Sequence, residues 1–332
     1  MKVLYILPHT FISGASIQLR SLLDHLPPDI ERTVFVTNFD GVLGPELSEK
    51  SRLISITARA PEERLDILKR YLVNDFDILH VIEAWDGYRL LPYFKKKKIV
   101  TMYGNYKRHD KYFKKRLSKL SEQGNDQPVL VTDNPRNLGI IPGIRYIKTG
   151  VVPPDPNHYV PRGNGVIWVG RNSDEKRLRL LFKVAEELPG TEFTAVISGA
   201  LPMEKLPENV TVYHNVLRTI EMEYLYKSNS IYLNTSKHEG TPQALIESMW
   251  CGCIPVCPNT GGIVELLGRN GIVVNSSSRG KDDDKNVEKF VKALRLIQSL
   301  PGKAGLRDAI IDSVKDYHIE HMMRDWEAIY YE

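Results

Sequence analysis

The stretch that says most about the fold is His238-Glu239-Gly240-Thr241-Pro242-Gln243-Ala244-Leu245-Ile246-Glu247-Ser248-Met249-Trp250-Cys251-Gly252-Cys253-Ile254-Pro255-Val256. Thr241 is a favourable N-cap, and Pro242 suits the first helical position, where no backbone N–H is needed. The mostly apolar run that follows predicts a buried helix ending near Gly252, where glycine favours termination. The last residues of the stretch read as a buried strand.

Two carboxylates lie eight residues apart in this stretch. Glu239 precedes the predicted helix, and Glu247 lies two turns inside it. The free N–H groups and positive dipole end of such a helix suit a phosphate, and Gly240 lets backbone approach a ligand closely. Glu239 can accept hydrogen bonds from sugar hydroxyls, and Glu247 from a ribose. The alternative is an ordinary capped, buried helix with two surface glutamates.

The same residues carry a resemblance to a known family. The run resembles the E-x7-E element of the large retaining nucleotide-sugar glycosyltransferase family with the GT-B fold (glycosyl transferases group 1, family 4 type). The matching positions are Glu239, Gly240, Pro242, Glu247, Gly252, Pro255 and Val256. The segments Thr260–Glu265 and Asn270–Val274 also resemble the family's next loop and strand.

Apolar β-rich runs alternate with helical runs along the whole chain, which predicts an α/β fold with parallel sheets. The predicted strands include 78–82, 129–132, 231–233 and 272–274, and one of the predicted helices covers 110–122. The expected class is GT-B: two Rossmann-like, doubly wound domains facing across a cleft. The expected divisions are an acceptor-side domain over 1–150, a Pro- and Gly-rich linker over 151–165, a nucleotide-sugar-binding domain over 166–314, and a terminal helix over 315–332 that crosses back to the first domain.

Ligands of doubly wound folds bind at the carboxyl ends of the strands. After the strand over 166–169 come Gly170, Arg171 and Lys176, which resemble the family's G-R-x-x-x-x-K element; its two cations hold the donor diphosphate. The alternative is a solvated charge run. The resemblance also implies donor contacts at Gly14, Ala15, Gly199, Val216, Leu217, Gly240, Thr241, Pro242, Gln243, Gly261 and Gly262.

One position departs from the family pattern. The family places a histidine at the end of a first-domain strand, near the reacting sugar, but this chain has Met102-Tyr103 there. Tyr103 can donate a hydrogen bond from the same place, so we take it as a catalytic candidate beside Glu239, Arg171 and Lys176. His80 and His109 are better explained as structural or acceptor-side residues.

The net charge of +4 is unevenly distributed. Twelve cations and the single acid Asp110 fall between Arg89 and Lys119, a surplus of +11 (twelve minus one). Such a field attracts anions, which predicts an anionic acceptor or surface: a phosphorylated or lipid-linked glycan at a membrane, or nucleic acid. The alternative is a solvated helix face. The acceptor-side candidates are Lys95, Lys96, Lys97, Lys98, Tyr106, Lys107, Arg108 and His109.

Composition is that of a packed globular protein, with 42% apolar and 26% charged residues among 332. No apolar run reaches the roughly 18 residues that a bilayer-spanning helix needs, and the first eight residues read as a buried strand rather than a secretory signal. Cys251, Cys253 and Cys257 read as buried thiols in a reducing compartment, without a metal site. We expect a cytoplasmic protein, either free or peripheral at a membrane.

The resulting functional hypothesis is transfer of a sugar from a nucleotide diphosphate, UDP in the first instance, to an acceptor hydroxyl. The resemblance implies retention at the anomeric carbon and no obligatory cofactor or divalent metal. The acidic run Asp282–Asp284 is expected in a surface loop. Two rivals stay open: a nucleotide-sugar epimerase of the same fold, and a basic DNA- or membrane-binding protein on an inactive transferase scaffold.

Overall fold

The chain forms two compact units. The computed structural model describes residues 1–72, 76–103, 115, 118, 120, 126–201, 205–216, 219–277 and 283–332. Unit 1 comprises Met1–Gly150 and Glu320–Glu332, and unit 2 comprises Val151–Ile319. The residues expected to form a linker, 151–165, are therefore part of unit 2. There Val151 pairs with His318, and the N–H of Gly163 donates to the carbonyl of Ser228.

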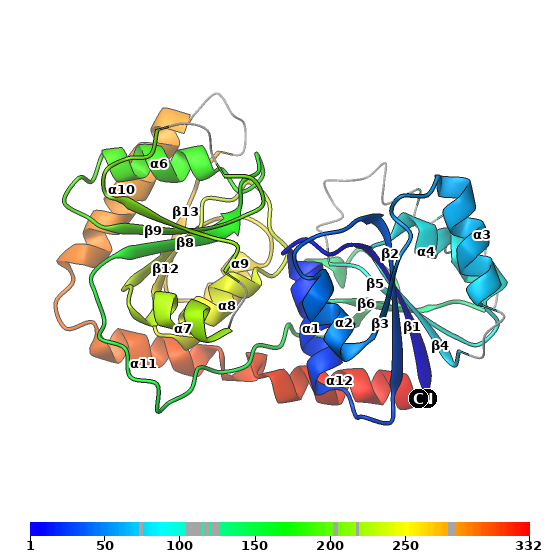
Figure 1. Ribbon diagram of the computed structural model, residues 1–332. Coiled ribbons are helices and arrows are strands. Elements are labelled where there is room, and N and C mark those ends of the chain that lie inside the picture. Colours follow the sequence, from blue (N-terminus) through cyan, green and yellow to red (C-terminus); the bar gives the residue numbers. More distant parts are fainter. Residues whose placement is uncertain are drawn as a thin grey trace. The chain divides into compact units, whose positions relative to one another are not determined.

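Unit 1 is built on a seven-stranded sheet in the order β3-β2-β1-β4-β5-β6-β7, with every described pairing parallel (Figure 1). Its central strands are continuous buried apolar runs, as expected when helices cover both faces of a sheet. The strands are β1 (Lys2–His9), β2 (Glu31–Phe39), β3 (Arg52–Ser55), β4 (Ile78–Ile82), β5 (Lys97–Thr101), β6 (Val129–Thr132) and β7 (Arg145–Tyr146). The α-helices are α1 (Gly14–His25), α2 (Gly44–Lys50), α3 (Pro61–Tyr71), α4 (Trp85–Leu90) and α12 (Ile319–Tyr331).

The last helix, α12, is tied to unit 1 by a buried polar network. The Tyr330 hydroxyl lies 3.1 Å from the Tyr5 hydroxyl and 2.9 Å from Nδ1 of His80. Nε2 of His80 lies 2.6 Å from Oγ1 of Thr101. Burial lowers the pKa of His80 to about 3, so this imidazole is neutral at physiological pH. His80 therefore has a structural role, and the C-terminal segment is part of the unit 1 core.

Unit 2 repeats the architecture with six strands in the order β10-β9-β8-β11-β12-β13 (Figure 1). The strands are β8 (Val166–Arg171), β9 (Phe193–Ser198), β10 (Val210–His214), β11 (Ile231–Leu233), β12 (Ile254–Pro258) and β13 (Ile272–Val274). The α-helices are α6 (Leu178–Glu186), α7 (Thr219–Lys227), α8 (Gln243–Trp250), α9 (Ile263–Leu267), α10 (Asp283–Ser299) and α11 (Ala304–Ser313). The prediction of two Rossmann-like α/β units is confirmed.

Two local predictions need correction, and a third lies largely outside the residues that the structure describes. Helix α8 begins at Gln243 rather than at Pro242; Pro242 is its N-cap, and Thr241 makes no cap. Gly252 follows the helix with a φ of +72°, the left-handed conformation expected of a terminating glycine. Helix α10 begins at Asp283, so the acidic run is not wholly a loop. The helix expected over 110–122 lies largely outside the described residues.

Candidate functional site

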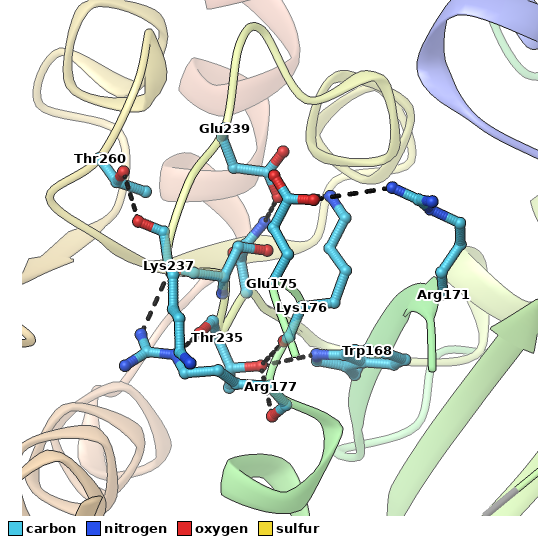
Figure 2. Close-up of polar contacts among 11 residues, drawn as sticks. Trp168, Arg171, Glu175, Lys176, Arg177, Thr235, Lys237, Glu239 and Thr260 are labelled. Atoms are coloured by element: carbon cyan, nitrogen blue, oxygen red, sulfur yellow. Dashed lines mark hydrogen bonds and ion pairs between the residues drawn. The ribbon is translucent and has the colours of Figure 1, made fainter. Parts of the chain in front are cut away.

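The polar residues predicted from the sequence gather at one edge of the unit 2 sheet. All described pairings in this sheet are parallel, so the loops that follow β8, β11 and β12 leave it at the same edge. Lys176 lies in the turn after β8, and Glu239 in the loop after β11. Nζ of Lys176 lies 2.7 Å from Oε1 of Glu239 (Figure 2). Nδ2 of Asn234 donates to the same oxygen at 3.2 Å.

This ion pair is largely withdrawn from water. The side chains of Lys176 and Glu239 are 22% and 7% exposed. Burial alone would raise the pKa of Glu239, but the charge and hydrogen bond of Lys176 and the bonds from Ser236 and Asn234 bring that pKa below its ordinary value. Glu239 is therefore an ionised hydrogen-bond acceptor at neutral pH, held in place before any ligand arrives.

Buried cross-links fix the loops that carry the pair. Arg177 adopts a left-handed φ of +53°, and its guanidinium donates to the carbonyls of Thr235, Ser236 and Ser277. The hydroxyl of Thr235 donates to the Lys176 carbonyl at 2.7 Å and accepts from Nε1 of Trp168 at 2.9 Å (Figure 2). These cross-links could not be predicted from the sequence, because their members come from separate segments and one of them depends on an unusual backbone conformation.

A second cation, Arg171, ends β8 and is more loosely held. Its side chain is 42% exposed, and among the described residues it forms an ion pair with Glu175 at 3.7 Å. The neighbouring Lys237 instead pairs with the exposed Asp174 at 2.8 Å. Lys237 was not among the residues predicted for the site. Arg171 is thus the cation near Lys176 that can turn toward a ligand at little cost.

The loop after β12 packs directly on the backbone of Glu239 and Gly240. The N–H of Gly262 donates to the Gly240 carbonyl at 2.9 Å. Gly261 has a φ of +58°, and a Cβ built on it would lie 1.9 Å from the Glu239 carbonyl oxygen. Only glycine fits at this position. The contacts between the two loops bring together four residues that the sequence predicted for one site, Glu239, Gly240, Gly261 and Gly262.

Helix α8 begins immediately after this contact. Thr241, Pro242 and Gln243 form its start, and Oε1 of Gln243 is a buried atom with no hydrogen-bond partner within the described parts of the chain. Glu247, one turn further on, accepts a hydrogen bond from the Tyr226 hydroxyl at 2.9 Å. The sequence did not reveal Tyr226, which comes from α7.

The remaining unit 2 candidates lie at the ends of β8, β9 and β10. Gly170 packs against Trp168, where a Cβ would lie 3.0 Å from the indole ring. Gly199 has a φ of +82°; its N–H donates to Oδ1 of Asn215 and its carbonyl lies 2.6 Å from Nε2 of His214. Val216 is partly buried and packs against the unit 2 core, and Leu217 lies outside the described residues.

In unit 1, Gly14 and Ala15 open α1 behind the N-cap Ser13, whose hydroxyl accepts from the N–H of Ser16. The N–H of Tyr103 donates to Oε1 of Glu83 at 3.1 Å. Burial raises the pKa of the Tyr103 phenol well above its ordinary value, with further contributions from Asp133 and Glu83. The phenol is therefore protonated at neutral pH and can donate a hydrogen bond.

Two acids beside Tyr103 were not found from the sequence. Asp133 lines a small pocket with Tyr103, and burial raises its pKa to about 7, against the lowering effect of its bond from Thr149. Glu83 has a left-handed φ of +50°. Both follow strands, β6 and β4, so their position at strand ends was the available signal.

The lysine run lies at the other edge of the unit 1 sheet. Lys97 and Lys98 begin β5, whereas Tyr103 follows its carboxyl end. Lys98 is buried and pairs with Asp126 at 2.5 Å, and Lys96 pairs with Asp77 at 3.3 Å. Lys95 donates to the Pro92 carbonyl. The other acceptor-side candidates, Tyr106, Lys107, Arg108 and His109, lie outside the described residues.

Two features are absent from the described residues. No helix there is both long and apolar enough to cross a membrane. No group of three or more His, Cys, Asp or Glu side chains in that part of the chain is placed to hold a metal ion. Cys251, Cys253 and Cys257 are buried free thiols.

Comparison with solved structures places the whole chain in a known architecture. A glycosyltransferase from Rickettsia africae is 18% identical, with a TM-score of 0.72 over 99% of this chain and 97% of that one. HepE from Anabaena, in complex with UDP and glucose, is 13% identical, with a TM-score of 0.77 over 100% and 99%. Sucrose-phosphate synthase from Thermosynechococcus elongatus is 15% identical, with a TM-score of 0.75 over 100% and 98%.

The chain has the GT-B fold. In addition, residues 163–299, most of unit 2, match the model of the family described as glycosyl transferases group 1. The match supports the likeness to the group 1 glycosyltransferases, and its range contains the predicted site residues Arg171, Lys176, Glu239 and Glu247. Among curated proteins, no sequence match is found.

Proposed function

We propose that this protein is a glycosyltransferase that moves a sugar from a UDP-sugar to an acceptor hydroxyl with retention. The observation that carries the proposal is the buried Lys176–Glu239 pair at the carboxyl edge of the unit 2 sheet, where a cation and an oriented acceptor lie 2.7 Å apart. A nucleotide-sugar needs both: a cation for the diphosphate and a carboxylate for the sugar hydroxyls. The family match over this unit and the UDP and glucose bound to HepE support the same assignment.

The proposed donor contacts follow from the placement of each side chain. Lys176 and Arg171 bind the diphosphate, together with N–H groups around Gly240 and at the start of α8. Glu239 accepts hydrogen bonds from the sugar, and Glu247, oriented by Tyr226, accepts them from the ribose. The buried Oε1 of Gln243, which has no hydrogen-bond partner among the described residues, is a further proposed donor contact, together with Gly261 and Gly262.

Leaving-group stabilisation is the proposed source of catalysis. When the glycosidic bond breaks, negative charge grows on the diphosphate. Lys176 is already desolvated, and a fixed cation in such a place stabilises developing charge more than a solvated cation does. Because Glu239 holds Lys176 in place, the two residues act together: one orients the sugar and the other receives the charge.

The acceptor side is assigned to unit 1. Tyr103 stands where the family has a histidine, and its protonated phenol donates a hydrogen bond to the reacting sugar or the acceptor hydroxyl. Gly14 and Ala15 lie at the start of α1, which follows β1 at the same carboxyl edge of the unit 1 sheet. We further propose that the reaction needs no divalent metal, since Arg171 and Lys176 supply the positive charge. Cytoplasmic location and an anionic acceptor stay predictions.

The test is nucleotide release. Purified protein is incubated with UDP-glucose, UDP-galactose or UDP-N-acetylglucosamine, and free UDP is measured with and without EDTA. We expect slow UDP release by donor hydrolysis, unaffected by EDTA and abolished in Glu239→Gln and Lys176→Ala. Lys183→Ala is the matched control, because Lys183 lies on the surface of α6 in an exposed ion pair with Asp284 of α10.

The two rival functions, a nucleotide-sugar epimerase and an inactive scaffold, predict other results in the same experiment. An epimerase would convert one nucleotide-sugar into another without releasing UDP, which mass spectrometry and chromatography of the nucleotide pool distinguish. An inactive scaffold would release nothing from any donor. Loss of activity in EDTA that is restored by a divalent metal would overturn the metal-free part alone.

A further inference from the structure

Two aromatic side chains stand exposed at the carboxyl ends of neighbouring strands in unit 1. Phe11 follows β1 and is 41% exposed, and Phe39 ends β2 and is 59% exposed. Their rings are stacked, with centroids 6.0 Å apart and planes inclined by 24°. His9 continues the row, with its ring centroid 5.3 Å from that of Phe11. Large apolar rings left in water in this way call for an explanation.

The backbone holds these rings in place. Four hydrogen bonds join the loop after β1 to the loop after β2. The N–H of Thr10 donates to the Phe39 carbonyl, and its Oγ1 donates to the Gly41 carbonyl, both at 3.2 Å. Gly41 donates to Oγ1 of Thr10 at 2.6 Å, and Leu43 donates to the Thr10 carbonyl at 3.0 Å.

Gly41 makes the contact possible. A Cβ at this position would lie 2.5 Å from the backbone N of Phe11 and 2.6 Å from its ring. The two loops therefore pack backbone to backbone, and the aromatic row is a preformed surface rather than a pair of loose side chains. A surface that is rigid before binding loses little conformational entropy when a ligand settles on it.

The surroundings indicate what the surface binds. Asn38 and Asp40 flank Phe39, and Asp40 accepts hydrogen bonds from Ser55 and Thr57 at 2.9 and 2.7 Å. Between residues 36 and 50 the charged residues are Asp40, Glu46, Glu49 and Lys50, and Glu46 is paired with Arg20 at 2.9 Å, so no cluster of cations lies here. Attachment to an anionic membrane or to nucleic acid uses clustered Lys and Arg, so the local charge is unsuited to either.

A sugar ring fits these features. A pyranose presents a face of C–H groups, which packs on the electron-rich face of an aromatic ring, and an edge of hydroxyls that polar side chains can bind. We propose that His9, Phe11 and Phe39 form a stacking platform for the pyranose ring of a carbohydrate acceptor. The proposal rests on the proposed function in assigning the acceptor to unit 1, and it adds that the acceptor carries a pyranose ring that these side chains bind.

The experiment is saturation-transfer NMR with simple pyranosides. Methyl glucoside, methyl galactoside and N-acetylglucosamine are each added in excess to the full chain saturated with UDP. We expect transfer to the ring C–H protons of at least one pyranoside. Phe39→Ala and Phe11→Ala should weaken binding roughly two- to tenfold, the usual range for an aromatic contact. Phe39→Trp should restore it.

Three controls separate sugar binding at this surface from non-specific aromatic contacts, from unfolding and from loss of the donor site. Tyr159→Ala removes an exposed aromatic ring in unit 2 and should leave the transfer unchanged. Because Phe39 is exposed, its loss has little effect on folding, and unchanged circular dichroism checks this. UDP titration of each variant tests the donor site separately, so failure of UDP binding would count against the proposed function and not against the platform.

Two results would overturn the platform. One is transfer that is the same in wild type, Phe39→Ala and Phe11→Ala, or absent with every pyranoside. The other is Phe39-dependent sedimentation with phosphatidylglycerol vesicles in the absence of Phe39-dependent pyranoside binding, which would make the rings a membrane contact instead.

Discussion

Removing the cation of the buried pair should destabilise unit 2 in a pH-dependent way. At an effective dielectric constant of about 20, unit charges at the 2.7 Å separation of Lys176 and Glu239 attract by about 6 kcal/mol. Desolvation of the two groups offsets much of that attraction. Deleting one partner of a buried pair costs about 3 to 5 kcal/mol. Because Lys176 keeps 22% exposure, we expect Lys176→Met to lower the free energy of unfolding by about 3 kcal/mol, the lower end of that range.

The sign of the pH dependence follows from the pKa of Glu239. In the wild type this pKa is lowered, so the pair's contribution is present above the ordinary glutamate value and is lost as pH falls through the folded-state pKa. In Lys176→Met burial acts without its counterion and raises the pKa of Glu239. The variant therefore loses stability as pH rises through the interval between the ordinary and the raised value. The difference from wild type should be small near pH 4 and largest near pH 8.

Urea unfolding followed by tryptophan fluorescence measures this difference. Trp168 donates to Thr235, which in turn donates to the Lys176 carbonyl, so its emission reports on the same loops. Lys183→Met is the control for loss of a lysine from an exposed pair, and we expect it to lie within about 0.5 kcal/mol of wild type. A Lys176→Met protein as stable as this control at about pH 8, or one whose deficit does not change with pH, would refute the buried-pair reasoning.

Three further predictions test other parts of the structure. Burial raises the pKa of Asp133 to about 7, so the free energy of unfolding of the wild type, measured with urea, should fall by up to about 4 kcal/mol between about pH 4 and pH 7. In Asp133→Asn this fall should disappear, and an unchanged pH profile would contradict the raised pKa of Asp133. Gly261→Ala places a Cβ 1.9 Å from the Glu239 carbonyl oxygen, so UDP binding measured by calorimetry should be lost or the thermal transition lowered; wild-type values for both would show that the loop does not pack as described. Tyr226→Phe removes the hydrogen bond to Glu247 and should raise the KM for the UDP-sugar roughly fivefold, with kcat nearly unchanged, as seen in initial rates of UDP release; an effect on kcat alone would argue against a ribose role for Glu247.

The sequence predicted the sheets better than the boundaries of short helices. The strands Ile78–Ile82, Val129–Thr132, Ile231–Leu233 and Ile272–Val274 have the predicted bounds, because buried parallel strands are continuous apolar runs between polar breaks. The start of α8 differed by a residue, since a Thr-Pro pair is compatible with more than one cap geometry.

Tertiary contacts explain what the sequence could not predict at the site. Arg177 looked like part of a solvated charge run, yet its left-handed backbone turns the guanidinium into the core to hold the Glu239 loop. Conversely, the run Lys95–Lys98 looked like one anionic-ligand surface, but Lys96 and Lys98 pair with Asp77 and Asp126 from distant positions in the chain. Residue type and spacing carry no information about such partners.

The most direct test of the central claim is UDP release from a panel of UDP-sugars by wild type, Glu239→Gln and Lys183→Ala. We expect wild type and Lys183→Ala to release UDP from at least one donor at equal rates, and Glu239→Gln to bind UDP but to release none from the sugar donor. Equal rates of UDP release by wild type and Glu239→Gln, or no release by wild type from any donor, would contradict it.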